Sequence, residues 1–209
     1  MKLNFIVTGT GRCGTLNMAH NLTKVGIHCG HECVFNTRGT IQTSLLSTLQ
    51  GDVWFDLSKL EADSSYMAAP FLQDFDATKI HLIRNPLQVI SSFVKNLEYF
   101  QVPIKRPDQA HFEDFILHHC PSIATLSTPL ERACKYYLEW NKMISNHTVV
   151  LHKIEDDVNI LFEQLSLPRL DRPSEQKNLF KNRDKDFEIK DIPEPLKQEI
   201  IDFMETHGY

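Results

Sequence analysis

The residues best suited to chemistry lie in one glycine-rich segment near the N-terminus, Gly9-Thr10-Gly11-Arg12-Cys13-Gly14-Thr15. The segment follows the apolar run of residues 3–7, precedes a helical pattern and holds three of the chain's eight glycines. A strand that turns through glycines into a helix presents backbone N–H groups and the positive end of the helix dipole to one point. We therefore expect a phosphate or sulfate to bind here, with an ordinary tight turn as the alternative.

The same segment lacks a residue that a nucleoside triphosphate needs. Loops that bind ATP or GTP follow the pattern G-x-x-x-x-G-K-[ST], in which the lysine reaches the outer phosphates and the hydroxyl holds magnesium. Gly9 and Gly14 have this spacing, but Thr15 follows directly and the cation of the loop is Arg12. The pattern disfavours ATP or GTP hydrolysis and favours another ligand with a 5'-phosphate.

A second strand-to-helix junction, Arg84-Asn85-Pro86, follows the apolar run of residues 80–83. Asn85 can cap a helix and Pro86 suits its first turn. Ser92 then lies on the polar face of that helix, so Arg84 and Ser92 could hold one phosphate between a guanidinium and a hydroxyl. The alternative is an Arg84 ion pair beside a solvated Ser92.

A third segment, His28-Cys29-Gly30-His31-Glu32-Cys33, gathers five side chains that can move protons or bind metals. Zinc sites usually need two ligand pairs with recognisable spacing, and no C-x-x-C pair occurs elsewhere in the chain. We expect no metal here. Gly26 ends the preceding helix, and the segment should return as a short strand near the glycine loop.

Short apolar runs alternate along the chain with helical patterns, which predicts an α/β fold with a mostly parallel central sheet flanked by helices. Ligands of such sheets bind at the carboxyl ends of the strands. The expected strands are 3–8, 53–57, 79–83 and 147–152, and the expected helices are 14–25, 64–73, 87–98, 129–145 and 157–167. Residues 101–128 should be an insertion over the sheet, within a single domain of residues 1–209.

Charge and composition limit the partners. The net charge of −5 gives no electrostatic support for nucleic acid or an acidic membrane as a partner, so an anion must be held by a local basic site. No apolar run approaches a membrane span or a secretion signal, and the five cysteines are an odd number. We expect a cytoplasmic protein with reduced thiols.

Two of these segments resemble motifs of the sulfotransferases that use 3'-phosphoadenosine-5'-phosphosulfate (PAPS). The stretch Gly11-Arg12-Cys13-Gly14-Thr15 resembles their 5'-phosphosulfate loop, P-[KR]-S-G-T. Arg84-Asn85-Pro86 with Ser92 is similar to their 3'-phosphate motif, an arginine and a serine eight residues on. The later stretch Ile154-Glu155-Asp156 resembles a Glu-Asp segment of that family, and its carboxylates should cap the next helix or orient neighbouring groups.

The resemblance implies a P-loop three-layer sandwich that moves a sulfuryl group from PAPS to an acceptor hydroxyl on a sugar, peptide, lipid or small molecule, without a metal. It implies that Gly11, Arg12, Cys13, Gly14 and Thr15 bind the 5'-phosphate, with Arg12 offsetting charge in the reaction, and that Arg84 and Ser92 bind the 3'-phosphate. The product would be 3',5'-adenosine bisphosphate.

The third segment is similar to the Cys-Gly-Glu-Glu segment of tyrosylprotein sulfotransferases, whose second glutamate is the base. The match assigns this role to Glu32, while His31 replaces the first glutamate and is the rival base. Two other functions stay open. One is a P-loop kinase that phosphorylates a small hydroxyl substrate, and the other is a non-catalytic nucleotide-binding module.

Overall fold

The computed structural model describes residues 2–36, 39–40, 59–96, 110–173 and 187–209. The chain divides into two units, Met1–Ile83 with Met143–Lys177 and Arg84–Lys142 with Asn178–Tyr209. A single domain over residues 1–209 stays a prediction.

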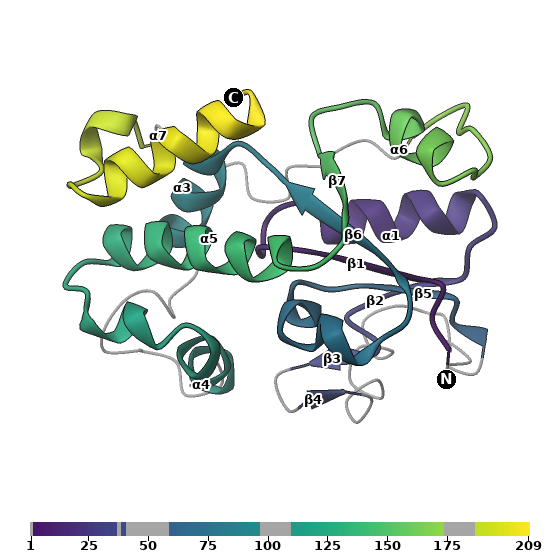
Figure 1. Cartoon of the computed structure of the whole chain (residues 1–209), viewed down its shortest axis with the longest axis horizontal. Helices are drawn as coiled ribbons and strands as arrows, with labels where there is room; N and C mark the ends of the chain where they lie inside the picture. Colours follow the sequence, from purple (N-terminus) through teal and green to yellow (C-terminus); the bar gives the residue numbers. More distant parts are fainter. Residues whose placement is uncertain (1, 37–38, 41–58, 97–109, 174–186) are drawn as a thin grey trace. The chain divides into compact units, whose positions relative to one another are not determined.

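A five-stranded parallel sheet is the centre of the first unit (Figure 1). Its strands are β1 (Phe5–Gly9), β2 (Cys29–His31), β5 (Ala62–Ser64), β6 (Thr78–Ile83) and β7 (Val150–Lys153). They lie in the order β2-β5-β1-β6-β7, and each neighbouring pair is parallel. Because parallel strands end at the same edge, the segments that follow β1, β2 and β5 meet there.

Helices cover the sheet because their apolar faces need burial. Met18 and Leu22 of α1 (Thr15–Lys24) pack with Phe162 of α6 (Val158–Gln164) against buried side chains of β1 and β6. The 3₁₀ helix η3 (Tyr66–Asp74) also contacts β1, and Figure 1 shows α1 and η3 on opposite sides of the sheet. The predicted α/β fold with a parallel sheet flanked by helices is confirmed.

The second unit is helical. It holds α3 (Pro86–Asn96), α4 (Ala110–His119), η6 (Pro121–Thr125), most of α5 (Pro129–Ser145), η7 (Ile189–Asp191) and α7 (Leu196–His207). Aromatic rings make much of its core. Tyr136 packs against Phe93 with ring centroids 5.3 Å apart and against Trp140 at 5.0 Å.

Most elements lie where the sequence predicts them, but β5 was not expected. Residues 64–73 were expected to be an α-helix and are instead the end of β5 and a 3₁₀ helix that contains Pro70. The strand expected at 53–57 and residues 101–109 of the expected insertion lie outside the described residues. Within 110–128 the chain forms α4 and η6. A small antiparallel pair joins β3 (Phe35–Asn36) to β4 (Gly39–Thr40).

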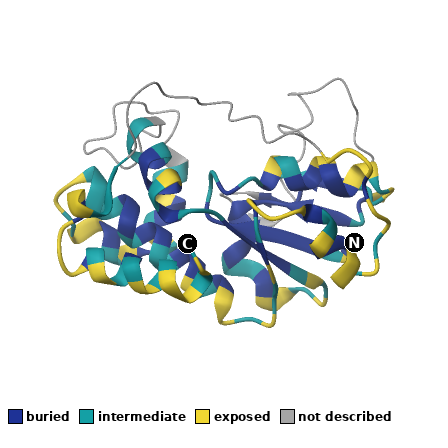
Figure 2. Ribbon diagram, turned by 90° about the horizontal axis from the view of Figure 1, so that it is seen from above, coloured by how far each residue is buried: buried dark blue, intermediate teal, exposed yellow. Residues whose placement is uncertain are grey.

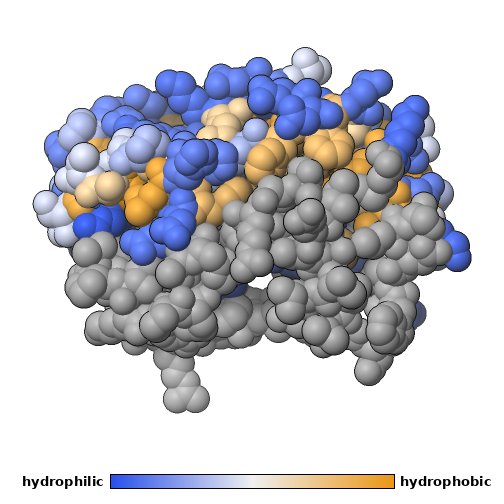
Figure 3. All heavy atoms as spheres, turned by 90° about the horizontal axis from the view of Figure 1, so that it is seen from below, coloured by the Kyte–Doolittle hydropathy of each residue, from blue (hydrophilic) through white to orange (hydrophobic). Residues whose placement is uncertain are grey.

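Burial follows the layers. Strands β1, β2 and β5 are almost entirely buried, whereas the edge strand β7 is partly exposed, as are the outer faces of the helices (Figure 2). Figure 3 shows one face of the molecule, on which hydrophobic residues form a cluster bordered by hydrophilic residues. Within the described ranges, none of the helices combines the length and the apolar character that crossing a membrane requires.

Candidate functional site

The glycine loop, residues 9–15, connects β1 to α1 and bends through two left-handed residues. Arg12 has a φ of 68° and Gly14 a φ of 93°. A Cβ on Gly9 would overlap the Leu82 carbonyl oxygen and lie 2.5 Å from Cys13 Sγ. The loop therefore needs glycine at position 9 because it packs closely on β6 and on its own cysteine.

The start of α1 has neither a side-chain cap nor an acidic residue that would repel an anion. Gly14 directly precedes the helix, and Met18 N donates to Gly14 O at 3.0 Å. The first turn of a helix carries the positive end of the helix dipole.

The third segment lies beside the glycine loop, as the sequence predicts. Residues Cys29–His31 form β2, and a hydrogen bond of 3.2 Å joins His31 Nε2 to Thr15 Oγ1. Glu32 follows directly, with a left-handed φ of 57°, and its N–H donates to Ser64 O at 3.2 Å. Thr15, His31 and Glu32 therefore share one edge of the sheet.

His31 and Glu32 have shifted pKa values that favour their neutral forms. Burial lowers the pKa of His31 to about 4, with a contribution from the charge of His20. Burial raises the pKa of Glu32 to about 7, and the charge of Asp63 adds to this rise. His31 Nε2 lies 3.9 Å from Glu32 Oε1, yet the pair is no ion pair near neutral pH because the imidazole is uncharged there.

Strand β5 adds two polar residues that the sequence analysis did not single out. Asp63 and Ser64 are fully buried. The Ser64 hydroxyl donates to Thr15 O at 2.8 Å, and the Asp63 carboxylate accepts N–H bonds from the turn after Glu32. An alternation of apolar and polar residues does not identify such a strand. The signal that could have identified it is the run Asp63-Ser64-Ser65 between apolar residues.

Arg84 and Ser92 belong to the second unit, and the glycine loop belongs to the first. Arg84 Nε and an Nη atom donate to Gln88 Oε1 at 3.2 and 3.0 Å. Asn85 Oδ1 accepts from Leu87 N at 3.0 Å, so the predicted cap of α3 is confirmed. Ser92 is half-buried on α3.

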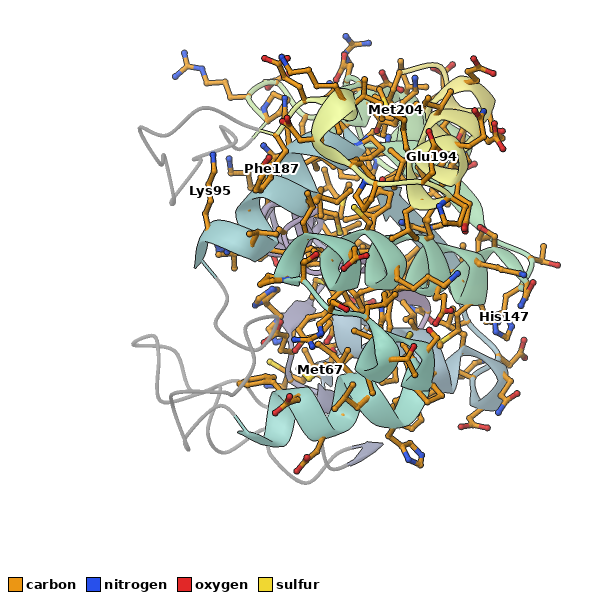
Figure 4. All side chains as sticks on the ribbon, turned by 90° about the vertical axis from the view of Figure 1, so that its left-hand side faces the viewer. Met67, Lys95, His147, Phe187, Glu194 and Met204 are labelled. Atoms are coloured by element: carbon orange, nitrogen blue, oxygen red, sulfur yellow. The ribbon has the colours of Figure 1, made fainter. Side chains whose placement is uncertain are left out.

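Ser91, next to Ser92, is the buried serine of α3, and its hydroxyl accepts from Phe187 N at 2.8 Å. Figure 4 shows Phe187 beside this helix.

The expected cap of the helix after Glu155 and Asp156 needs correction. The capping side chain is that of the next residue, Asp157, which accepts from Asn159 N at 2.9 Å because it alone precedes α6 directly.

A metal centre has no support among the described residues, where no three His, Cys, Asp or Glu side chains are grouped to hold an ion. None of the five cysteines forms a disulfide, and all five are buried. A hollow of about 600 Å³ is lined by Lys2–Phe5, Asp76–Lys79 and Thr148–Val150. These residues are at the amino ends of β1, β6 and β7, whereas parallel sheets bind ligands at the carboxyl ends, so we do not assign the hollow to the site.

Comparison with known proteins finds likenesses in structure. No protein-family model matches the chain, and no curated protein matches it. Among solved structures, the chain is similar to a sulfotransferase from Alicyclobacillus acidocaldarius, with 16% sequence identity and a TM-score of 0.46 over 84% of this chain and 87% of the other. Identity and TM-score at this level say nothing of activity.

Proposed function

We propose that this protein is a sulfotransferase that moves the sulfuryl group of PAPS to an acceptor hydroxyl. The observation that carries the proposal is the 3.2 Å hydrogen bond between Thr15 and His31, which brings an anion-binding turn next to a carboxyl group with a raised pKa. Transfer between a bound anion and a hydroxyl needs these two parts side by side.

The glycine loop fits a 5'-phosphate. Its helix start is uncapped and free of acidic residues, and Gly14 adopts a φ of 93° at the turn. Backbone N–H groups of residues 11–15 would hold the phosphate, with the Thr15 hydroxyl beside them. PAPS would supply a sulfuryl group on that phosphate. Arg12 would offset the charge that develops on the departing oxygen, without a lysine or magnesium.

Glu32 is the base of the proposed reaction. A carboxyl group with a pKa of about 7 is ionised in a large share of molecules at neutral pH and still binds a proton well. The acceptor oxygen bonds to sulfur as the bond from sulfur to the 5'-phosphate oxygen breaks. The hydroxyl proton goes to Glu32, and 3',5'-adenosine bisphosphate leaves. His31, with a pKa of about 4, is the weaker base and connects the segment to Thr15.

Arg84 and Ser92 stay predicted ligands of the 3'-phosphate. The acceptor is proposed by class only, as a hydroxyl on a sugar, peptide, lipid or small molecule.

The test compares ligands by thermal shift. We expect 3',5'-adenosine bisphosphate to stabilise the wild type by about 2.7 kcal/mol at 100 times its dissociation constant. Arg12→Ala should lower PAPS turnover roughly 100- to 1,000-fold, whereas Ala at the exposed Arg169 should leave it unchanged. Stabilisation by ATP with magnesium alone would favour the kinase. Bisphosphate binding without turnover on any acceptor, and with no effect of Glu32→Gln, would favour the non-catalytic module.

A further inference from the structure

Asp63 is a buried carboxylate in an inner strand of the sheet, next to the edge strand β2, and no step of the proposed reaction uses it. It lies in β5, between β2 and β1, in register with Gly30 and Ile6. Its side chain has no exposed surface. A charge in such a place is costly unless strong hydrogen bonds compensate for the lost water.

The compensation comes from three consecutive backbone N–H groups. Asp63 Oδ1 accepts from Cys33 N at 3.1 Å, and Oδ2 accepts from Val34 N at 3.2 Å and Phe35 N at 3.4 Å. The turn of residues 33–35 therefore wraps around one carboxylate. Such bonds favour the ionised form, while burial acts more strongly and raises the pKa of Asp63 to about 6.

The residue directly before this turn is Glu32, whose backbone is left-handed with a φ of 57°. A non-glycine residue in this region needs surroundings that hold it there. On one side Glu32 N donates to Ser64 O at 3.2 Å, and on the other Asp63 binds the next three N–H groups. Strand β5 therefore holds both sides of Glu32.

Gly30, which pairs with Asp63 across the sheet, leaves the space that the carboxylate occupies. A Cβ on Gly30 would lie 2.7 Å from Asp63 Oδ1 and 2.8 Å from Cys33 Cβ. The position needs glycine because the carboxylate and the turn occupy the space that a side chain would take. An alanine here would displace the carboxylate without removing its charge.

We propose that Asp63 is the positioning residue of the site, whose carboxylate binds the turn of residues 33–35 and thereby fixes the direction of Glu32. This inference rests on the proposed role of Glu32 as the base. Asp63 touches neither phosphate nor acceptor and acts through Glu32 alone. It also contributes a negative charge that disfavours ionisation of Glu32 and raises its pKa.

The groups that can act on Glu32 come from three elements. Asp63 of β5 raises the pKa of Glu32 by its charge, and His31 Nε2 of β2 lies 3.9 Å from Glu32 Oε1. His20 of α1 lowers the pKa of His31. The Cys33 thiol donates to His31 O at 3.6 Å. Of these groups, Asp63 is therefore the one to substitute in a test of the pKa of Glu32.

The experiment follows two signals by NMR: the carboxyl titration of Glu32, assigned with Glu32→Gln, and hydrogen exchange of the Cys33, Val34 and Phe35 amides. In Asp63→Asn the Glu32 midpoint should move from about 7 to lower pH, because the like charge is gone. The three amides should exchange at least about fivefold faster, since they lose a charged acceptor.

Two further variants separate position from charge. Gly30→Ala keeps the carboxylate charged but displaces it, so we expect faster exchange of the three amides without the downward shift of the Glu32 midpoint that Asp63→Asn causes. Glu61→Gln is the matched control, because Glu61 Oε2 accepts from His28 N at 3.0 Å at the other end of β2. It should leave both signals unchanged.

The wild type alone gives a third measurement should Asp63→Asn fail to fold. As the pH falls through about 6, Asp63 gains a proton, and the three amides should lose protection relative to their intrinsic exchange rates. An unchanged exchange rate in this titration and in Gly30→Ala, or an unmoved Glu32 midpoint in a folded Asp63→Asn, would overturn the inference. None of these signals needs a nucleotide. Failure of the protein to bind 3',5'-adenosine bisphosphate would therefore contradict the proposed function and leave the role of Asp63 intact.

Discussion

At the scale of single residues, Glu32 combines a left-handed backbone with a raised pKa, and a purely structural residue needs neither. Glu32 adopts a left-handed backbone, and its side chain is only 32% exposed, in a place where burial raises its pKa to about 7. Strained backbone and shifted pKa values each cluster at functional sites. His31 beside it is shifted the other way, so it stays neutral over the range in which Glu32 ionises.

The opposite pKa shifts of His31 and Glu32 predict which of the two residues sets the pH dependence of kcat/KM. A base must be ionised to accept a proton, so kcat/KM should rise with pH and level off above about 7, the pKa of Glu32. His31→Gln should keep this midpoint, while Glu32→Gln should lower turnover roughly 100- to 10,000-fold. The measurement is release of 3',5'-adenosine bisphosphate from PAPS between pH 4 and 9, with a panel of hydroxyl acceptors. A midpoint near 4 that His31→Gln removes would make His31 the base.

At the scale of elements, the loop between β1 and α1 depends on the backbone of Gly14. Its φ of 93° disfavours any side chain, and a Cβ would lie 2.8 Å from both Cδ1 and Cγ1 of Ile154. Gly26, at the other end of α1, has a φ of 90° and no atom within 4 Å of its would-be Cβ. The two glycines thus share a conformation but differ in the space around them.

This pair predicts two different losses of stability. Gly26→Ala carries only the left-handed strain, about 1–2 kcal/mol, whereas Gly14→Ala adds the overlap with Ile154 and should cost more. Urea unfolding followed by circular dichroism measures both free energies. Equal losses in the two variants would mean that Ile154 moves aside without cost and that the loop is less tightly packed than its geometry indicates.

Strand β5 shows why one element escaped sequence reasoning. Apolar runs identify β1 and β6, and amphipathic spacing identifies α1, α3 and α5. In β5 two of the three residues, Asp63 and Ser64, are polar yet buried. Their burial depends on partners in β2, in α1 and in the turn after Glu32, which no local pattern contains.

At the scale of the whole molecule, the open question is how the two units unfold. Each holds a helix with a side-chain cap: Asp157 caps α6 in the first unit, and Asn85 caps α3 in the second. An alanine at either position removes a cap worth about 1 kcal/mol. The two substitutions are therefore matched probes of the two units.

A single domain predicts one calorimetric transition that both variants lower. Asp157→Ala and Asn85→Ala should each reduce Tm by roughly 2–4 °C, the shift expected for about 1 kcal/mol in a chain of this size. Scanning calorimetry of the wild type and both variants makes the measurement. Two transitions, each lowered by one variant alone, would replace the single domain with two.

Local sequence patterns predict the α/β fold with its parallel sheet, the glycine loop, the return of β2 beside it and the cap of α3, because glycines, caps and apolar periods act over a few residues. The rest of the site depends on how the chain folds in three dimensions. The fold brings His31 to Thr15, buries Asp63 beneath the turn after Glu32 and moves the pKa values of His31 and Glu32 in opposite directions. Burial and charge depend on neighbours from strands that lie far apart in the chain, and a one-dimensional pattern does not contain those neighbours.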